Sequence, residues 1–228
     1  MYVFFIPESV KTVAAFVASA TALAIAIFRE QMGRWFYHPD LDLEAMVQIP
    51  NAQRVGRGRR QERDGYITNL GDAWYFRLAI TNTGNAPARD VQLYLKRIEK
   101  VDGTNINRFS PMNLRWTHRE DTTRKVLLRD IPAFCDFIHI GDPTFRVASG
   151  EDLPTVPLNQ GIISLDVEAI SSALAHLLEP GAYLFHLVLA AENSRARSFT
   201  VEVRYNGTWS PHEGQMLDQE IGFRMKNV

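Results

Sequence analysis

The segment HPDLDLE at 38–44 is the best candidate for metal chemistry, because its carboxylates alternate with leucines. If the segment forms a strand, Asp40, Asp42 and Glu44 share one face, since successive side chains of a strand point to opposite sides. Oxygen ligands on one face could hold a hard cation. The alternative, which we prefer, is the solvated face of a first strand whose two leucines point into the core. We therefore predict no metal site here.

Histidines beside acidic residues are the next candidates for catalysis. His118 begins the segment HRED, and His139 begins the segment HIGD. Such neighbours are more typical of hydrogen bonds in loops than of a metal ligand or a general base. His186 lies inside an apolar segment, where a satisfied or half-exposed imidazole is expected. None of these histidines is predicted to be catalytic.

Cys135 is the single cysteine, so no intrachain disulfide can form. This fits a reducing compartment, although many periplasmic domains also lack disulfides. We expect a small core thiol, because a reactive one needs a nearby base or a helix N-terminus. The chain also lacks the phosphate-loop, C-x-x-C, H-E-x-x-H and G-x-S-x-G motifs. We therefore predict a protein that is not an enzyme and that binds no cofactor.

An arginine-rich segment, QRVGRGRRQERDG at 53–65, is predicted to be an exposed loop between the first two strands. On the cytoplasmic side of a membrane, such a cluster attracts anionic lipid headgroups by about 1 kcal/mol per side chain. It could equally bind an acidic patch on a partner protein, or it could simply be solvated. The predicted lipid- or partner-contact residues are Arg54, Arg57, Arg59, Arg60 and Arg63. A formal net charge of −1 argues against a nucleic-acid partner.

An uncharged segment runs from Thr12 to Phe28, which is about the minimum of ~17 residues for a helix that crosses a bilayer. The alternative is a signal peptide, because Ala-Ser-Ala at 18–20 resembles a cleavage site. The apolar run continues past this site, and the extreme N-terminus carries no basic residue, so an anchor is favoured. We predict a tail and a single transmembrane helix (about 10–28) within residues 1–35.

The residues that flank this helix predict its orientation. Aromatic residues suit the interfacial belts of a membrane, and the anchors predicted after the helix are Trp35, Phe36 and Tyr37. Arginines are more frequent after the helix than before it, so the positive-inside rule places the C-terminal domain in the cytoplasm. The predicted location is the bacterial cytoplasmic (inner) membrane, with a single pass.

Small residues line one side of the predicted helix, because residues four apart in a helix nearly stack. Small faces let two helices approach closely in lipid, so other integral membrane subunits are the predicted partners. Chance composition could also produce such a stripe. The helix lacks histidine, so it is not expected to ligate chlorophyll through that side chain. The predicted helix-packing residues are Ala14, Ala15, Ala18, Ser19, Ala22 and Ala26.

The remainder of the chain alternates apolar and polar residues, which is typical of strands with one buried face. The predicted strands lie around 41–49, 74–81, 91–96, 183–189, 199–205 and 221–223. One short helix is predicted over 167–178, where leucines recur at helical spacing before Pro180-Gly181. Several short strands separated by turns indicate an antiparallel β-sandwich over residues 36–228.

The segment YFRLAITNTGNAPARDVQLYL resembles the hairpin of immunoglobulin-like domains of the CARDB type, which are common in prokaryotic surface and membrane proteins. Two later segments, LEPGAYLFHLVLAAEN and YNGTW, resemble a broad set of uncharacterised bacterial proteins. Members of that set pair one N-terminal membrane helix with such a sandwich. The resemblance implies a mainly β, immunoglobulin-like fold, and its structural motifs specify no activity.

Together these features predict a non-catalytic accessory or scaffolding subunit of a larger bacterial membrane complex, respiratory or photosynthetic. In type it resembles the small accessory chains of reaction-centre–light-harvesting complexes. The alternative is a membrane-tethered sensor or a ligand- or peptide-binding module, in envelope stress or antiphage defence. A deep pocket with convergent polar groups would favour the binding module, and a flat surface would favour the subunit.

Overall fold

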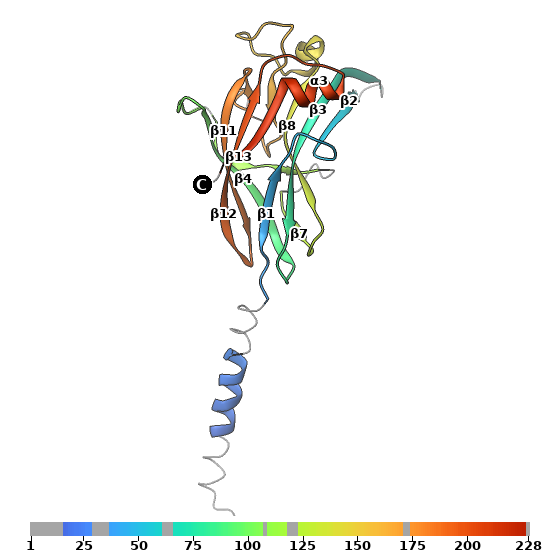
Figure 1. Ribbon diagram of the computed structural model, residues 1–228. Helices are drawn as coiled ribbons and strands as arrows, with labels where there is room; N and C mark the ends of the chain where they lie inside the picture. The colour runs from blue at the N-terminus through green and yellow to red at the C-terminus, as the bar shows by residue number, and fades with distance from the viewer. Residues whose placement is uncertain are drawn as a thin grey trace, which may run out of the picture. The chain divides into compact units, whose positions relative to one another are not determined.

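The computed structural model describes residues 16–28, 37–60, 66–106, 109–117, 123–170 and 174–226. Contacts within the chain divide it into two units, Met1–His38 and Pro39–Val228. In the first unit, residues 16–28 form a helix whose side chains are exposed (Figure 1). Within the described part of the chain, no helix is both long enough and apolar enough to cross a bilayer.

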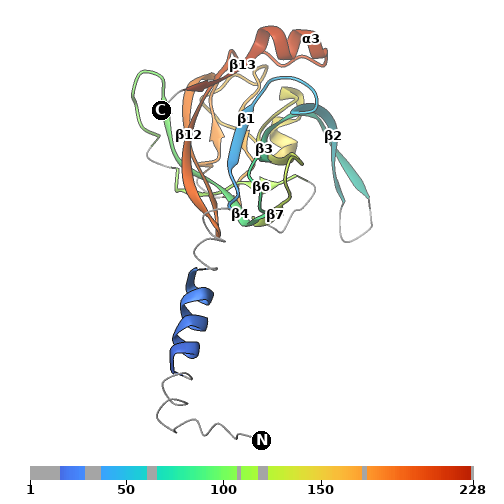
Figure 2. The ribbon, with the colours of Figure 1, turned by 60° about the horizontal axis from the view of Figure 1, so that its bottom comes forward.

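The second unit contains two antiparallel sheets, of which the first has seven strands. These are β1 (Leu41–Ala45), β2 (Ala52–Arg60), β3 (Ile67–Asn82), β6 (Arg115–Trp116), β8 (Ala133–Gly141), β9 (Ile163–Leu165) and β10 (Leu177–Leu178). Their order is β1-β3-β8-β9-β10, while β2 also pairs with β3 and β6 with β8. β1 and β2 therefore lie one after the other along the same long strand (Figure 2).

The second sheet has six strands in the order β13-β12-β11-β4-β5, with β7 also paired to β4. These are β4 (Ala88–Lys100), β5 (Met112–Asn113), β7 (Lys125–Leu127), β11 (Gly181–Ala191), β12 (Ser194–Tyr205) and β13 (Ile221–Lys226). Its longest pairings join β11 to its neighbours, with Phe185 opposite Val201 on one side and Ile98 on the other.

Alternation along the strands explains how the two sheets pack. Phe76 and Leu78 of β3 and Leu93 of β4 are fully buried. Arg77, between the first two, is partly exposed, as are Gln92 and Tyr94 on either side of Leu93. One continuous apolar core contains residues of both sheets. At its centre, Phe137 of β8 meets Phe185 of β11 edge-to-face, with ring centroids 4.9 Å apart. The predicted mainly β fold is therefore confirmed, as two antiparallel sheets that share a core.

The helix predicted over 167–178 is wrong for its described residues. Val167 forms a bridge with Leu114, and Leu177–Leu178 is strand β10; residues 171–173 lie outside the described part. The helical spacing was misleading because Leu177 packs in a small satellite core, while Leu178 belongs to the main core. The short helices observed in this unit are η1 (Pro143–Phe145), α2 (Arg146–Ser149), α3 (Glu213–Gln215) and the π-helix η2 (Met216–Glu220).

The arginine-rich segment at 53–65 also differs from its prediction as a loop. Residues 52–60 form strand β2, and Gln53 lies opposite Tyr75 of β3; residues 61–65 lie outside the described part. The prediction failed because this strand is held by backbone pairing with β3, and its side chains are too polar to show apolar alternation. The first strand is shorter than predicted, since β1 ends at Ala45 and Ile49 is exposed in a turn.

Candidate functional site

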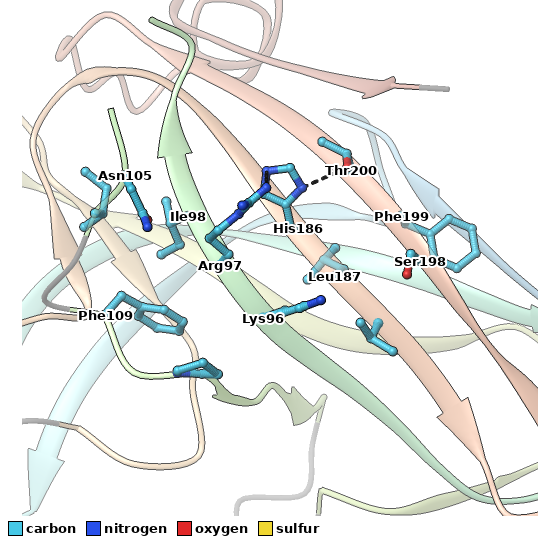
Figure 3. A pocket seen from close by; sticks show the side chains of 13 residues that line it. Lys96, Arg97, Ile98, Asn105, Phe109, His186, Leu187, Ser198, Phe199 and Thr200 are labelled. Atoms are coloured by element: carbon cyan, nitrogen blue, oxygen red, sulfur yellow. Dashed lines mark hydrogen bonds between the residues drawn. The ribbon is translucent and has the colours of Figure 1, made fainter. Parts of the chain in front are cut away.

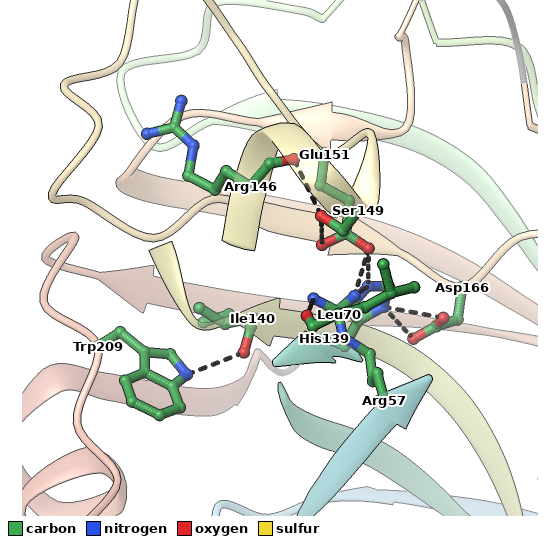
Figure 4. A network of polar contacts seen from close by, with 9 residues as sticks. All are labelled: Arg57, Leu70, His139, Ile140, Arg146, Ser149, Glu151, Asp166 and Trp209. Carbon is green, nitrogen blue, oxygen red and sulfur yellow. Dashed lines mark hydrogen bonds and ion pairs between the residues drawn. The ribbon is translucent and has the colours of Figure 1, made fainter. Parts of the chain in front are cut away.

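A cluster of charged side chains lies partly buried where β2, β8 and the segment after α2 come together (Figure 4). It joins Arg57 of β2, His139 of β8, Glu151 after α2 and Asp166 after β9, and we call these four residues the His139 cluster. The imidazole Nδ1 lies 3.0 Å from Asp166 Oδ1, and Nε2 lies 2.8 Å from Glu151 Oε1. Arg57 donates from Nη1 to the same Glu151 oxygen at 2.5 Å.

Sheet pairing brings these residues together. β2 and β8 both pair with β3, on its two sides, so Arg57 and His139 lie on strands that flank β3. Tyr75 of β3 lies directly opposite His139, and the two rings stack with centroids 5.0 Å apart. A register shift between Gly56 and Gly58 lets the Arg57 side chain reach the cluster.

The electrostatics of the cluster favour ionised side chains. Burial lowers the pKa of His139, but Asp166 and Glu151 at its two nitrogens outweigh burial and raise that pKa to about 10. Burial acts against the charge of Glu151 as well, yet His139 and Arg57 lower its pKa to about 2. Burial and the nearby Asp166 raise the pKa of Tyr75 to about 12, so its hydroxyl stays protonated. At neutral pH, two cations therefore face two carboxylates.

The contacts of His139 are suited to holding separate segments of the chain together by ion pairs, rather than to catalysis. A catalytic histidine presents one nitrogen to a nucleophile and the other to an orienting carboxylate, whereas both nitrogens of His139 face carboxylates. Those two carboxylates lie on opposite sides of the imidazole, where they cannot share one metal ion. Among the described residues, no three His, Cys, Asp or Glu side chains are arranged to hold a metal.

The segment between β8 and β9 folds around Arg146, whose side chain is only 2% exposed. Its Nη2 donates to Asp152 Oδ1 at 2.6 Å. The two terminal nitrogens also donate to the backbone carbonyls of Leu153, Val156, Pro157 and Gln160. Because Glu151 belongs to the same segment, this internal arginine holds the carboxylate that the His139 cluster requires.

An open groove of about 470 Å³ crosses the six-stranded sheet and the loop that follows β4. We call it the Lys96 groove. Its lining includes Lys96 and Arg97 of β4, His186 of β11, Thr200 of β12 and Phe109 of the loop (Figure 3). Cationic, hydroxyl and aromatic groups therefore converge on one open surface.

A β-bulge creates the basic part of this groove. Arg97 lies opposite His186, but the next pair in the register joins Leu95 to Leu187, so Lys96 is an additional residue in β4. Leu95 is buried, whereas Lys96 and Arg97 are both exposed. Consecutive residues of a regular strand point to opposite faces, so the bulge is what places two adjacent cations on the same face.

His186 is held in one orientation at the edge of the groove. Its Nε2 lies 3.0 Å from Glu99 Oε2, and its Nδ1 lies 3.2 Å from the Thr200 hydroxyl. A carboxylate can only accept, so Nε2 carries the hydrogen that faces Glu99, and the Thr200 hydroxyl is hydrogen-bonded to Nδ1. Glu99 also accepts from Arg97 Nε through its other oxygen, at 3.1 Å. The expectation of a satisfied, partly exposed imidazole at His186 is confirmed.

A second depression, of about 420 Å³, lies beside β2. There Arg54 Nη1 donates to the Pro211 carbonyl at 2.5 Å, and its Nε lies 3.6 Å from Asp72. The Trp74 indole donates to the Ser210 carbonyl at 2.8 Å. The main polar groups of this depression already have partners within the chain, so it is a weaker candidate for ligand binding than the Lys96 groove.

The predicted arginine contacts do not form one surface in the described residues. Arg57 belongs to the His139 cluster, with a side chain only 11% exposed, so it is not free to meet lipid or a partner. Arg54 donates a hydrogen bond to the Pro211 carbonyl in the second depression, while Arg59 is exposed. The Arg60 side chain and Arg63 lie outside the described part.

The predicted membrane residues are only partly described. Ala18, Ser19, Ala22 and Ala26 lie on the helix 16–28 and are exposed. Tyr37 is also exposed. The remaining predicted packing and anchor residues, Ala14, Ala15, Trp35 and Phe36, lie outside the described part.

The other candidate residues are placed as follows. On β1, Asp42 and Glu44 are exposed while Leu41 and Leu43 are buried, which confirms a solvated face. Asp40 pairs with Arg197 at 3.2 Å. The segment that begins at His118 lies outside the described part.

Two of the remaining predictions have clear outcomes. Cys135 is fully buried in the core, as predicted, and burial raises the pKa of its thiol. The expected loop hydrogen bond at His139 is wrong, because His139 lies in a strand and meets Glu151 and Asp166. Asp142 instead caps the helix η1.

Sequence reasoning missed both the His139 cluster and the bulge. The cluster has no local signal, because Arg57, His139, Glu151 and Asp166 come from separate elements. The bulge does have one: apolar residues alternate as far as Leu95, and the next apolar residue is Ile98. Two adjacent polar residues within an alternating strand predict either a strand end or a bulge.

Comparisons with family models, with curated proteins and with solved structures found no match to this chain.

Proposed function

We propose that this protein is a non-catalytic accessory or scaffolding subunit of a larger bacterial membrane complex, attached to the cytoplasmic membrane through its N-terminal segment. One observation carries the proposal: the helix 16–28 exposes its large apolar side chains. Phe16 is 76% exposed, Leu23 63% and Phe28 66%. Apolar surface of this extent marks contact with lipid or with other proteins.

The sequence around the helix supports its place in a membrane. The uncharged run begins before the described helix, at Thr12, and arginines follow it. We propose a single pass with the sandwich in the cytoplasm, where exposed arginines such as Arg59 attract anionic lipid headgroups. The small face at Ala18 and Ala22 then packs against helices of other subunits. Respiratory and photosynthetic assemblies, including reaction-centre–light-harvesting complexes, are the class of partner we propose.

The strand order supports the immunoglobulin-like part of the proposal. β1, β3 and β8 are adjacent in one sheet, and β4, β11 and β12 in the other. In chain order, these match strands A, B and E and strands C, F and G of immunoglobulin sandwiches. Such domains commonly serve as interaction modules. The His139 cluster fits a non-catalytic domain, because its charged groups bind one another.

The second candidate is a membrane-tethered sensor or peptide-binding module. The Lys96 groove favours it, because polar and aromatic groups converge there on an open surface of suitable size. The two candidates differ in where recognition occurs, namely along the helix for the subunit and at the groove for the binding module.

The test is isolation of the full-length protein from native membranes in mild detergent. We expect it to resist alkaline carbonate extraction and to co-purify with other membrane proteins. Replacing Ala18 and Ala22 by leucine should leave the protein in the membrane but release its partners, because larger side chains keep helices apart. Ala20→Leu with Ala24→Leu is the matched control, since these positions lie about 200° around the helix from Ala18 and Ala22.

Three results would contradict the proposal. Extraction by carbonate would exclude the membrane anchor. A free monomer in mild detergent would exclude the subunit role. Equal loss of partners in both double variants would show that the small face is not the contact surface.

A further inference from the structure

The Lys96 groove contains a positive charge that the described residues do not compensate. Glu99 is the acidic group at this position, and both of its oxygens are occupied, one by Arg97 Nε and the other by His186 Nε2. Within the described part of the chain, no ion pair involves Lys96. The groove therefore presents the Lys96 ammonium group, together with Nη1 of Arg97, to whatever enters it, while Nη2 of Arg97 lies 3.4 Å from His186 Nε2.

The bulge in β4 determines which of its side chains face the groove. An additional residue interrupts the ladder between β4 and β11, and bulges of this kind commonly re-aim side chains next to binding sites. A regular strand would have turned either Lys96 or Arg97 toward the core, where an unpaired charge is strongly unfavourable. Here the interruption directs both cations to the surface that His186 and Thr200 also line.

The far side of the groove differs in chemistry. Phe109 of the loop after β4 lies there, on the opposite side from Ser198 and Thr200 of β12 (Figure 3). Phe109 is only 9% exposed and packs in the main core, while Pro111 of the same loop also lines the groove and is exposed. A ligand that spans the groove therefore meets a small apolar surface, on the loop that carries Phe109 and Pro111, as well as the cations. A small anion would use only the cations and leave Pro111 exposed to water.

We propose that the Lys96 groove binds an extended, acidic segment of a partner protein. One carboxylate of that segment lies between Lys96 and Arg97, and an apolar side chain packs against Pro111, beside the largely buried Phe109 ring. Charge-assisted hydrogen bonds to guanidinium and ammonium groups are the strongest polar contacts available to a carboxylate. This inference rests on the second candidate function and does not depend on the N-terminal helix.

The test uses the full-length protein in mild non-ionic detergent and a fluorescent peptide of alternating glutamate and leucine. Fluorescence anisotropy should show saturable binding that weakens as salt is added. Lys96→Gln with Arg97→Gln should weaken binding by at least about tenfold, because two charge-assisted contacts are lost. Arg89→Gln with Lys100→Gln is the matched control, since it removes the same charge from other exposed positions of β4 and should leave binding unchanged.

Four outcomes would overturn the inference. They are an absence of binding to the wild-type protein at millimolar peptide, equal binding of a glutamine–leucine peptide, equal loss in both double variants, and full displacement by millimolar inorganic phosphate. The last would identify a simple anion site. Since the membrane test is read from partner release by the helix variants, failure of the groove inference leaves the subunit proposal intact.

Discussion

The stability of the sandwich should fall as the pH rises above neutrality, because His139 is held as an imidazolium. Asp166 and Glu151 outweigh burial and raise its pKa from 6.5 to about 10. The folded state therefore binds a proton that the unfolded state releases near 6.5. The resulting stabilisation is fully present below the unfolded pKa and is lost as pH rises through the folded pKa, with a slope of about 1.4 kcal/mol per pH unit.

The full effect corresponds to about 5 kcal/mol, from the separation of the two pKa values. Glu151 contributes with the opposite sign, because its pKa is lowered from 4.5 to about 2. Its stabilisation is present above 4.5 and is lost as the pH falls through 2, for about 3 kcal/mol in total. The cluster therefore stabilises the fold most between pH 4.5 and 6.5.

The assay is urea unfolding of the full-length protein in non-ionic detergent, followed by tryptophan fluorescence between about pH 6.5 and 8.5. Over this range the wild type should lose about 2 kcal/mol, because the unfolded imidazole is already half deprotonated at pH 6.5. Higher pH is avoided because burial also raises the pKa of the Cys135 thiol above its usual 9.0, which gives a loss of the same sign. His139→Gln should be less stable by about 3–5 kcal/mol at pH 6.5, because the buried carboxylates lose their cation.

The decisive comparison is between slopes. His139→Gln should flatten the profile, whereas the control His186→Gln, at a more exposed histidine, should keep the wild-type slope. A flat wild-type profile, or an unchanged slope in His139→Gln, would show that His139 is not the protonated group and would refute the electrostatic reasoning.

Three further predictions concern single residues. Arg146→Lys should lower amide-exchange protection in residues 150–160 by about tenfold or more, because an ammonium cannot reach the carbonyls that the guanidinium joins; unchanged protection would contradict this role. Gly71→Ala should destabilise the fold by about 2 kcal/mol in urea unfolding, since Gly71 has φ +73° and a methyl group there would overlap the Phe145 ring; wild-type stability would show that this contact relaxes freely. Cys135 should react with a thiol reagent only at the unfolding rate, because it is fully buried, and rapid labelling of the native protein would count against that placement.

Local alternation was sufficient to predict most of the sandwich. Trp74, Phe76 and Leu78 point inward from β3 as the period of two requires. The same argument placed the leucines of β1 inside and its carboxylates in water. These predictions succeeded because each strand buries one face. The apolar and polar residues of such a strand alternate, and this alternation can be read from adjacent positions in the sequence.

Elements stabilised by pairing or by distant packing were not predictable in this way. β2 contains little apolar alternation and is held by its backbone against β3. The leucines of 167–178 show helical spacing although they form no helix where they are described, because Leu177 packs in the small satellite core and Leu178 packs in the main core.

The sequence by itself determined the class of fold, the buried cysteine and the exposed carboxylates of the first strand, because each depends on local spacing and residue type. Only the tertiary structure decided the two candidate sites. The His139 cluster exists because sheet pairing brings Arg57 beside His139 and because Arg146 folds a loop that delivers Glu151. The Lys96 groove exists because a register shift against β11 directs adjacent cations to one face. Both sites depend on which strands are neighbours in the sheets. Contacts between segments that are distant in the sequence produce no periodic pattern of residues from which they could be predicted.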